Sequence, residues 1–375
     1  MLKRTLRILS CVILLIISAL LFIGQPDKGF TSDVFTDKDY AHIMKDNITG
    51  DPLVTDIAML AAHDALSYGI TKDSPFDSDG IKGAEAIVGF LNDKGIINAV
   101  GGGVISRLSA AQKSSAYELL KRGARYFDLR VAEYKGEWYI CHGPAISVKL
   151  SVCLEDFMRF LDETDGELVV LELRHVYFKE LTHTDLNGYM ESFIYNGKKL
   201  VDFIRFDAKA TPLEDLRYSD AVNGGSGIVV LTPESSYPTQ KNDGTVVIKD
   251  DTADWAYGIL PRAVWHNQVD DEKILEGIRT EYEYLKNNMN EFKGNFRINQ
   301  AQKTPTFAFG SIAQSLLSWS LIDMADKFNA SLSEQPDIKD WLSVMPVFQV
   351  DYADSMKDGF NDKIMGIINE YNGQL

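Results

Sequence analysis

The chain has 375 residues, of which 45% are hydrophobic, and its formal net charge is −16 at pH 7. This length and apolar content suffice for a large buried core and exclude a disordered or fibrous protein. The acidic balance excludes nucleic acid as a partner, because binding it requires a cationic surface that neutralises phosphates. It also argues against purely electrostatic docking on anionic membranes, so a lipid would be reached through apolar or local contacts.

The first 25 residues have the pattern of an export signal. Lys3, Arg4 and Arg7 precede an almost unbroken apolar run over 8–23, and a polar stretch follows at once. The run is somewhat short for a bilayer span and shows no clear cleavage site. A cleaved signal peptide and an uncleaved N-terminal membrane anchor therefore both stay open. In either case we expect an exported protein, secreted or held at the outer face of a membrane.

Residues 26–51 are polar and lack a sustained hydrophobic period, which indicates a linker with a short helix. No internal repeat or second boundary follows, so we expect one catalytic domain over 52–375. Short apolar runs within it predict strands, and the chain between them is long enough for helices. Strands are expected at 56–62, 124–131, 168–173, 227–231 and 347–350 and near 264–265 and 296–298, with a hairpin at 133–139.

Helices are expected at 109–120, 154–161, 271–288 and 312–328, the first with Ser109 as its start signal and Gly123 marking its end. Alternation of strands and helices over this length favours a parallel α/β barrel or a doubly wound sheet. The segment 65–107 between the first strand and the first helix is read as an elaborated loop with helical pieces.

Four polar side chains follow the predicted strands: His63, Asp128, Arg130 and His142. Barrel enzymes place their catalytic groups at such strand ends. Cleavage of a phosphodiester without metal needs a base, an acid and a fixed cation for the phosphoryl charge. Two histidines and one arginine fill these roles, and Asp64 and Asp128 are placed to orient them.

These motifs, taken in order, resemble the X domain of phosphatidylinositol-specific phospholipases C. The segments that carry the resemblance are Ala61-Ala62-His63-Asp64, Gly123-Ala124-Arg125-Tyr126-Phe127-Asp128-Leu129-Arg130 and Cys141-His142-Gly143. The resemblance covers residues 56–173 well and is weaker afterwards. It implies an irregular TIM-like (β/α)8 barrel and a bacterial, metal-independent type of enzyme.

The resemblance also implies a two-step reaction. An inositol 2-hydroxyl attacks phosphorus, diacylglycerol leaves, and water then opens the cyclic inositol phosphate. On this reading His63 is the general base, His142 is the general acid, Arg130 stabilises the phosphoryl charge and Asp64 supports the acid. Asp351 is similar in place to the carboxylate that pairs with the base; it is preferred over Asp354 because it comes first after its strand.

The substrate site is expected to include Asp128, Arg130, Glu172 and Arg174, with no metal and no cofactor. Calcium-dependent relatives carry acidic residues at both alternate positions of the second strand, since the ion needs oxygen ligands. Here the second position is Arg130, whose cation takes that place. Glu172 remains open as a metal ligand or as a partner of Arg130 or Arg174.

Cys141 and Cys153 form a disulfide or are two buried thiols, because spacing alone does not show that they face each other. The substrate is phosphatidylinositol, a glycosyl-phosphatidylinositol or another phosphodiester at a membrane surface, and a monomer is expected. The competing functions are a catalytically silent surface binding protein on the same barrel and a calcium-dependent phosphodiesterase.

Overall fold

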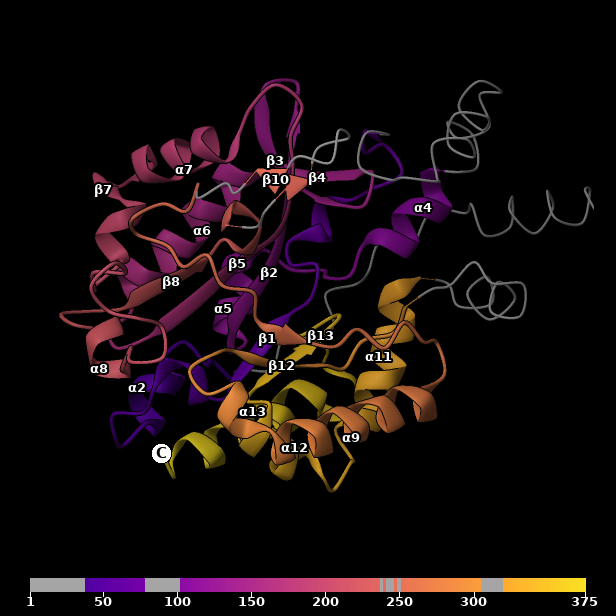
Figure 1. Cartoon of the computed structure of the whole chain (residues 1–375). Coiled ribbons are helices and arrows are strands. Elements are labelled where there is room, and N and C mark those ends of the chain that lie inside the picture. The colour runs from indigo at the N-terminus through magenta and orange to yellow at the C-terminus, as the bar shows by residue number, and fades with distance from the viewer. Residues whose placement is uncertain (1–37, 78–101, 237–238, 241–245, 248–250, 305–319) are drawn as a thin grey trace, which may run out of the picture.

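The computed structural model describes residues 38–77, 102–236, 239–240, 246–247, 251–304 and 320–375 (Figure 1). The expected leader over 1–25, most of the first expected loop and the start of the helix expected at 312 lie outside the described residues. Within those ranges, no helix combines the length and apolar character needed to cross a membrane.

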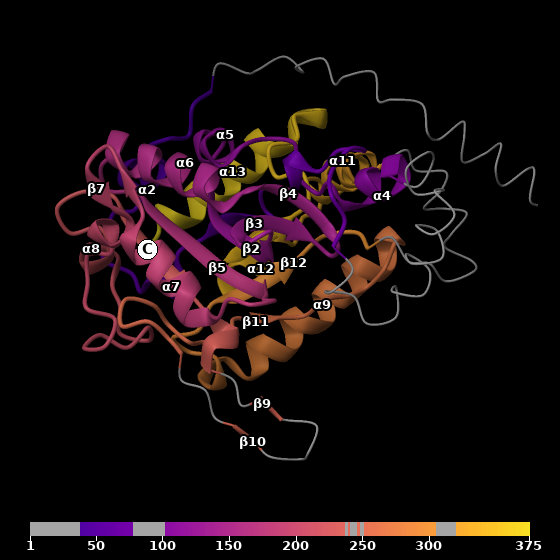
Figure 2. The same ribbon diagram turned by 90° about the horizontal axis from the view of Figure 1, so that it is seen from above.

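A curled, mainly parallel sheet forms the centre of the molecule (Figures 1 and 2). Its strands run in the order β11-β12-β13-β1-β2, and β5 continues from β2 and pairs with β8. Near-continuous apolar sequence explains why β1, β8 and the first part of β5 are buried on both faces. Their bounds are β1 (Met59–Ala62), β2 (Ala124–Tyr134), β5 (Leu168–Tyr177), β8 (Gly227–Leu231), β11 (Arg262–Ala263), β12 (Arg297–Gln300) and β13 (Val347–Val350).

One segment touches both edges of this curled sheet. Tyr257 forms a parallel bridge with Leu231 at the end of β8, and shortly afterwards Arg262 begins β11, which pairs with β12. The sheet therefore curls into an irregular TIM-like barrel, which confirms the predicted fold class. The strand expected near 264–265 begins earlier than predicted, at Arg262.

The alternation of β2 separates an inner from an outer layer. Tyr126 contacts Phe296 across the inside, with ring centroids 5.5 Å apart, although β2 and β12 are not neighbours. Phe127 points the other way and packs edge-on against Phe157 of α6 (Leu150–Glu163), with centroids 4.8 Å apart. The inward side chains of β2 are thus the ones available to a site inside the barrel.

The helices agree with the expected pattern at some places and differ at others. α6 and α9 (Asp271–Asn287) lie where predicted. Ser109 ends a helix rather than starting one: α5 begins at Ala116, with a capping box between Ser115 and Glu118. The remaining helices are α2 (Ile43–Asn47), α4 (Gly102–Ser109), α5 (Ala116–Lys121), α7 (His183–Ser192), α8 (Tyr218–Ala221), α11 (Leu321–Leu332), α12 (Ile338–Val344) and α13 (Phe360–Asn372).

Beyond the barrel, β2 continues into an antiparallel extension with β3 (Glu137–His142) and β4 (Ala145–Lys149). The predicted hairpin is therefore confirmed, with a turn at Lys135 and Gly136, both of which have positive φ. Cys141 of β3 and Cys153 of α6 are buried free thiols in the structure, so the disulfide is not formed. The extension delivers His142 to the rim of the barrel.

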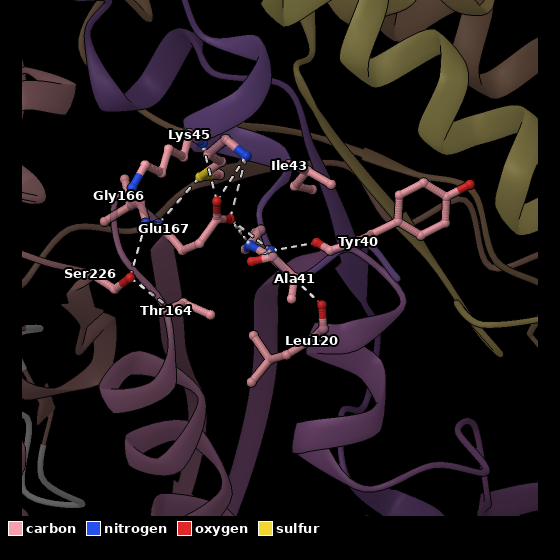
Figure 3. A network of polar contacts seen from close by, with 12 residues as sticks. Tyr40, Ala41, Ile43, Lys45, Leu120, Thr164, Gly166, Glu167 and Ser226 are labelled. Atoms are coloured by element: carbon pink, nitrogen blue, oxygen red, sulfur yellow. Dashed lines mark hydrogen bonds and ion pairs between the residues drawn. The ribbon is translucent and has the colours of Figure 1, made fainter. Parts of the chain in front are cut away.

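A buried ion pair connects residues 40–45, the lead-in segment that precedes the first strand, to the barrel. Glu167, just before β5, and Arg125 of β2 are fully buried, and Arg125 Nη2 lies 2.7 Å from Glu167 Oε2. Arg125 also donates to the carbonyl oxygens of Tyr40 and Ala41, while Glu167 accepts the backbone N–H of Met44 (Figure 3). Residues 40–45 of the polar segment are therefore packed on the end of the barrel opposite the C-terminal ends of the strands.

Candidate active site

The first site residues lie in a sharp turn at the C-terminal end of β1. The backbone N–H of His63 donates to the carbonyl of Val350, and Ala65 donates to the carbonyl of Asp128. Between them, Asp64 has φ of 42°, a left-handed conformation that is uncommon for a residue other than glycine. Backbone strain of this kind persists where the surrounding structure holds it. Here the turn directs the side chains of His63 and Asp64 into the barrel mouth, the opening at the C-terminal ends of the parallel strands.

His63 is held by Asp351, the first residue after β13. Its Nδ1 lies 2.7 Å from Asp351 Oδ1, so Nδ1 carries the proton that this hydrogen bond needs. Its Nε2 lies 3.3 Å from Nη2 of Arg130, which can only donate. Once the ring has lost one proton, these partners leave Nε2 as the ring nitrogen that accepts. Asp354, the competing carboxylate, instead accepts from the hydroxyl of Ser114.

Three neighbouring carboxylates determine the pKa of the His63 imidazole. Burial opposes its protonation, but Asp64, Asp351 and Asp128 outweigh that effect and raise the pKa of His63 to about 9. The imidazole therefore holds both protons at neutral pH in the unliganded site and becomes a competent base as the pH rises.

Asp64 lies at the centre of the cluster, with only 2% of its surface exposed. Its Oδ2 is 3.6 Å from His63 Nδ1 and 3.1 Å from His142 Nε2, and its Oδ1 forms an ion pair with Nε of Arg130. Burial opposes ionisation, yet the cations Arg130, His142 and His63 hold the pKa of Asp64 below its usual range. The two imidazoles are thus within contact of one carboxylate.

His142 has an acceptor on each ring nitrogen. Nδ1 lies 2.7 Å from the carbonyl oxygen of Ser109, which can only accept, and Nε2 faces Asp64. Both ring nitrogens thus face oxygen acceptors, and a proton on Nε2 would lie at the position from which a general acid acts. No sequence signal pointed to the Ser109 carbonyl, because any residue at the end of that helix would supply it.

Arg130 and Asp128 complete the inward face of β2 at the mouth. Asp128 Oδ2 lies 3.9 Å from both His63 Nε2 and Arg130 Nη2. Against the effect of burial, neighbouring carboxylates raise the pKa of Arg130 still further, so its guanidinium stays charged. The arginine that was expected to bind the phosphoryl group therefore lies beside the expected base.

Gln112 is a supporting residue whose role sequence reasoning missed. Its buried amide donates to the carbonyls of His63 and Val350 and accepts the N–H of Ala353. It therefore ties the β1 turn to the turn after β13. The expected helix over 109–120 had placed this residue on a helix, where such a connection would not form.

Glu172 and Arg174 form an ion pair on β5, the strand next to β2. Glu172 is fully buried, pairs with Asp128 in the strand register, and accepts from the hydroxyl of Tyr126 at 2.8 Å. Arg174 Nη1 donates to Glu172 at 2.7 Å, with the arginine side chain 19% exposed. The geometry therefore matches Glu172 as a partner of Arg174.

A metal ion has a conceivable set of ligands here. One atom each from His63, Asp64 and Asp128 lies within 4.8 Å of the others. The same carboxylates, however, already face Arg130, whose Nε pairs with Asp64. A divalent ion in that place would lie against a guanidinium, so the residues present do not fit a resident calcium ion well.

No protein-family model matches the chain. It is 28% identical over 327 residues to the variant-surface-glycoprotein phospholipase C of Trypanosoma cruzi, which covers 81% of this chain and 78% of that protein. It is 25% identical over 271 residues to PI-PLC X domain-containing protein 3 of Bos taurus, covering 71% of this chain and 74% of that protein.

Solved structures show the same fold. A phosphatidylinositol-specific phospholipase C from Staphylococcus aureus superposes with a TM-score of 0.54 at 16% identity, covering 88% of this chain and 97% of the other. The sequence similarities and the shared barrel together confirm the resemblance that the ordered motifs indicated.

Proposed function

From the confirmed resemblance to the phosphatidylinositol-specific phospholipase C X-domain family, we propose that this chain is a phosphodiesterase that cleaves an inositol phospholipid. The observation that carries the proposal is the meeting of His63 and His142 at one carboxylate with Arg130 beside them. A base, an acid and a fixed cation are the groups that such a cleavage requires.

In the first step His63 removes the proton from the inositol 2-hydroxyl through Nε2. The 2-oxygen forms a bond to phosphorus, and the bond from phosphorus to the glycerol oxygen breaks. His142 gives its proton to that leaving oxygen, so diacylglycerol departs and a cyclic inositol phosphate remains. Water then attacks phosphorus with the two histidines in exchanged roles, and the ring opens.

The carboxylates act through the imidazoles. Asp351 fixes the tautomer of His63 by accepting from Nδ1, at 2.7 Å. Asp64 lies against the acid His142 and holds Arg130 in place through its Nε. Arg130 then presents its planar donors to the phosphoryl oxygens, where negative charge develops.

Phosphatidylinositol is the proposed substrate. A glycosyl-phosphatidylinositol is the second candidate, and the name of the Trypanosoma cruzi relative, a variant-surface-glycoprotein phospholipase C, favours it. Both share the inositol phosphodiester on which the mechanism acts. Export by the N-terminal segment, which would bring the enzyme to such lipids, belongs to this proposal.

The test is release of water-soluble inositol phosphate from phosphatidylinositol vesicles, with and without a chelator. We expect turnover that the chelator leaves unchanged. Absence of turnover on either inositol lipid would favour a silent binding protein, and turnover abolished by the chelator would favour a calcium-dependent enzyme.

The histidines are tested in the same assay. His63→Ala and His142→Ala should each lose at least about 100-fold in activity, since general acid–base catalysis contributes that much. His42→Ala is the matched control, because His42 is exposed on the lead-in segment at the other end of the barrel. Near-full activity in either of the first two variants would remove that residue from the mechanism.

A further inference from the structure

A second histidine–carboxylate pair lies at the rim beside the catalytic cluster. His175 of β5 places its Nδ1 2.9 Å from Oε1 of Glu234, which follows β8. The other carboxylate oxygen, Oε2, accepts the backbone N–H of Val176 at 3.1 Å. Glu234 is therefore fixed at both oxygens. The proposed mechanism makes no use of this pair.

A β-bulge turns His175 toward the site. The register between β2 and β5 pairs Leu129 with Leu173 and then Arg130 with His175, so Arg174 is the extra residue. Side chains that pair across strands lie on the same face of the sheet. Without the shift, His175 would take the opposite face; with it, the imidazole shares the face of Arg130.

The hydrogen bond to Glu234 determines what the ring can offer. A carboxylate only accepts, so Nδ1 carries the proton and the neutral ring has its lone pair on Nε2. Across the described ranges of the chain, Nε2 has no hydrogen-bonding partner, and 42% of the side chain is exposed. Nε2 of His175 is thus an oriented acceptor at the rim, on the strand next to the one that carries Arg130, the arginine proposed to bind the phosphate.

The surrounding charge limits what this acceptor binds. With Glu234, the mouth holds five carboxylates, the others being Asp64, Asp128, Asp351 and Glu172. They still outnumber the four cationic groups, which are Arg130, Arg174 and the imidazoles of His63 and His142 when these are protonated. This excess of negative charge disfavours a second phosphate on the head group and leaves a neutral hydroxyl donor as the better match for Nε2.

We propose that His175, oriented by Glu234, accepts a hydrogen bond from a hydroxyl of a neutral polyol head group and so positions the substrate. The proposal rests on the proposed function and deepens it. It makes His175 a substrate-binding residue for an inositol ring without additional phosphates.

The first experiment measures binding of free myo-inositol to the full chain by saturation-transfer NMR. His175→Ala should weaken that binding about 5-fold, the value of one neutral hydrogen bond, whereas His175→Asn, which keeps an acceptor, should restore part of it. Glu234→Ala should weaken it to a similar degree because the ring loses its orientation. His42→Ala should bind as the wild type does.

Competition by inorganic phosphate separates a hydroxyl contact from a phosphate contact. His175→Ala should leave the affinity for phosphate unchanged, and an equal loss for phosphate and inositol would overturn the proposal. Inositol binding in His175→Ala equal to that of the wild type would overturn it as well, as would a wild type that does not bind inositol.

Turnover of phosphatidylinositol provides the second readout. His175→Ala should raise KM about 5-fold and leave kcat within about twofold, because one substrate contact is lost while acid, base and cation remain. A fall in kcat alone would contradict a positioning role. A wild type that binds inositol but releases no inositol phosphate would instead overturn the proposed function and leave the polyol site standing.

Discussion

At the scale of single residues, the proposed catalysis depends on the charge around His63. Asp351 both fixes its tautomer and, with Asp64 and Asp128, raises its pKa to about 9. A general base acts only when it has lost its proton. The rising limb of kcat/KM against pH should therefore extend into the alkaline range, with the activity increasing toward pH 9.

Replacing Asp351 with asparagine tests this directly. Asp351→Asn removes one negative charge from His63, so its pKa falls and the rising limb of kcat/KM should move to lower pH, while the maximal rate drops. The pH profile of phosphatidylinositol cleavage measures both effects. Asp354→Asn is the matched control: that carboxylate contacts Ser114, and its limb should stay at the wild-type position. A limb that does not move in Asp351→Asn would contradict the pairing.

Arg130 is the residue at which charge and shape can be separated. Arg130→Lys keeps the positive charge. The lysine ammonium lacks the planar guanidinium donors, however, so it cannot contact Asp64 and the phosphoryl oxygens at the same time. We expect kcat to fall about 100-fold, the scale on which one donor to the developing charge acts. Arg159→Lys, an exposed arginine on α6, should retain wild-type kcat in the same assay. Equal activity in the two variants would argue against phosphoryl stabilisation by Arg130.

At the scale of elements, the sequence predicted the strands that carry the site better than the turns that orient it. β8 and β13 have the predicted bounds, because apolar runs of four or five residues are too short for a helix and are typical of buried strands. His63 and His142 were placed at strand ends for the same reason. The capping box at Ser115 was missed because Ser109 also stands before an apolar segment, and only tertiary packing decides between them.

Other features of the site had no local signal. The bulge that brings His175 opposite Arg130 depends on pairing between two strands, and the Ser109 carbonyl that holds His142 is a backbone group. Gln112 likewise bridges turns that are distant in sequence. The order of residue types along the chain was thus sufficient to predict which side chains form the site. Their orientation comes from packing between segments that are distant in sequence.

The lead-in element gives a prediction about stability. Glu167→Gln removes one charge of a fully buried pair and leaves Arg125 without its counterion. We expect the free energy of unfolding to fall by about 3–5 kcal/mol, measured by urea denaturation. Glu370→Gln, in the exposed pair with Lys339, should cost no more than about 1 kcal/mol. Equal costs in the two variants would show that the buried network does not hold the lead-in segment.

At the scale of the whole molecule, the fold is held by one large apolar core with two small clusters beside it, and not by a disulfide between Cys141 and Cys153. Burial raises the pKa of Cys141 to about 12 and that of Cys153 well above its usual value, so neither forms a reactive thiolate in the native state. Both thiols should react with a thiol reagent only in denaturant, and a reductant should leave the melting temperature unchanged. A melting temperature lowered by the reductant would contradict the free-thiol arrangement.

In the proposed mechanism, two imidazoles and a guanidinium catalyse attack by a hydroxyl of the substrate itself. Phosphorus NMR of the products formed from phosphatidylinositol, in the presence of a chelator, tests it most directly. The cyclic inositol phosphate should appear first and the acyclic phosphate only later. Acyclic phosphate formed from the outset, with no cyclic species before it, would contradict the claim.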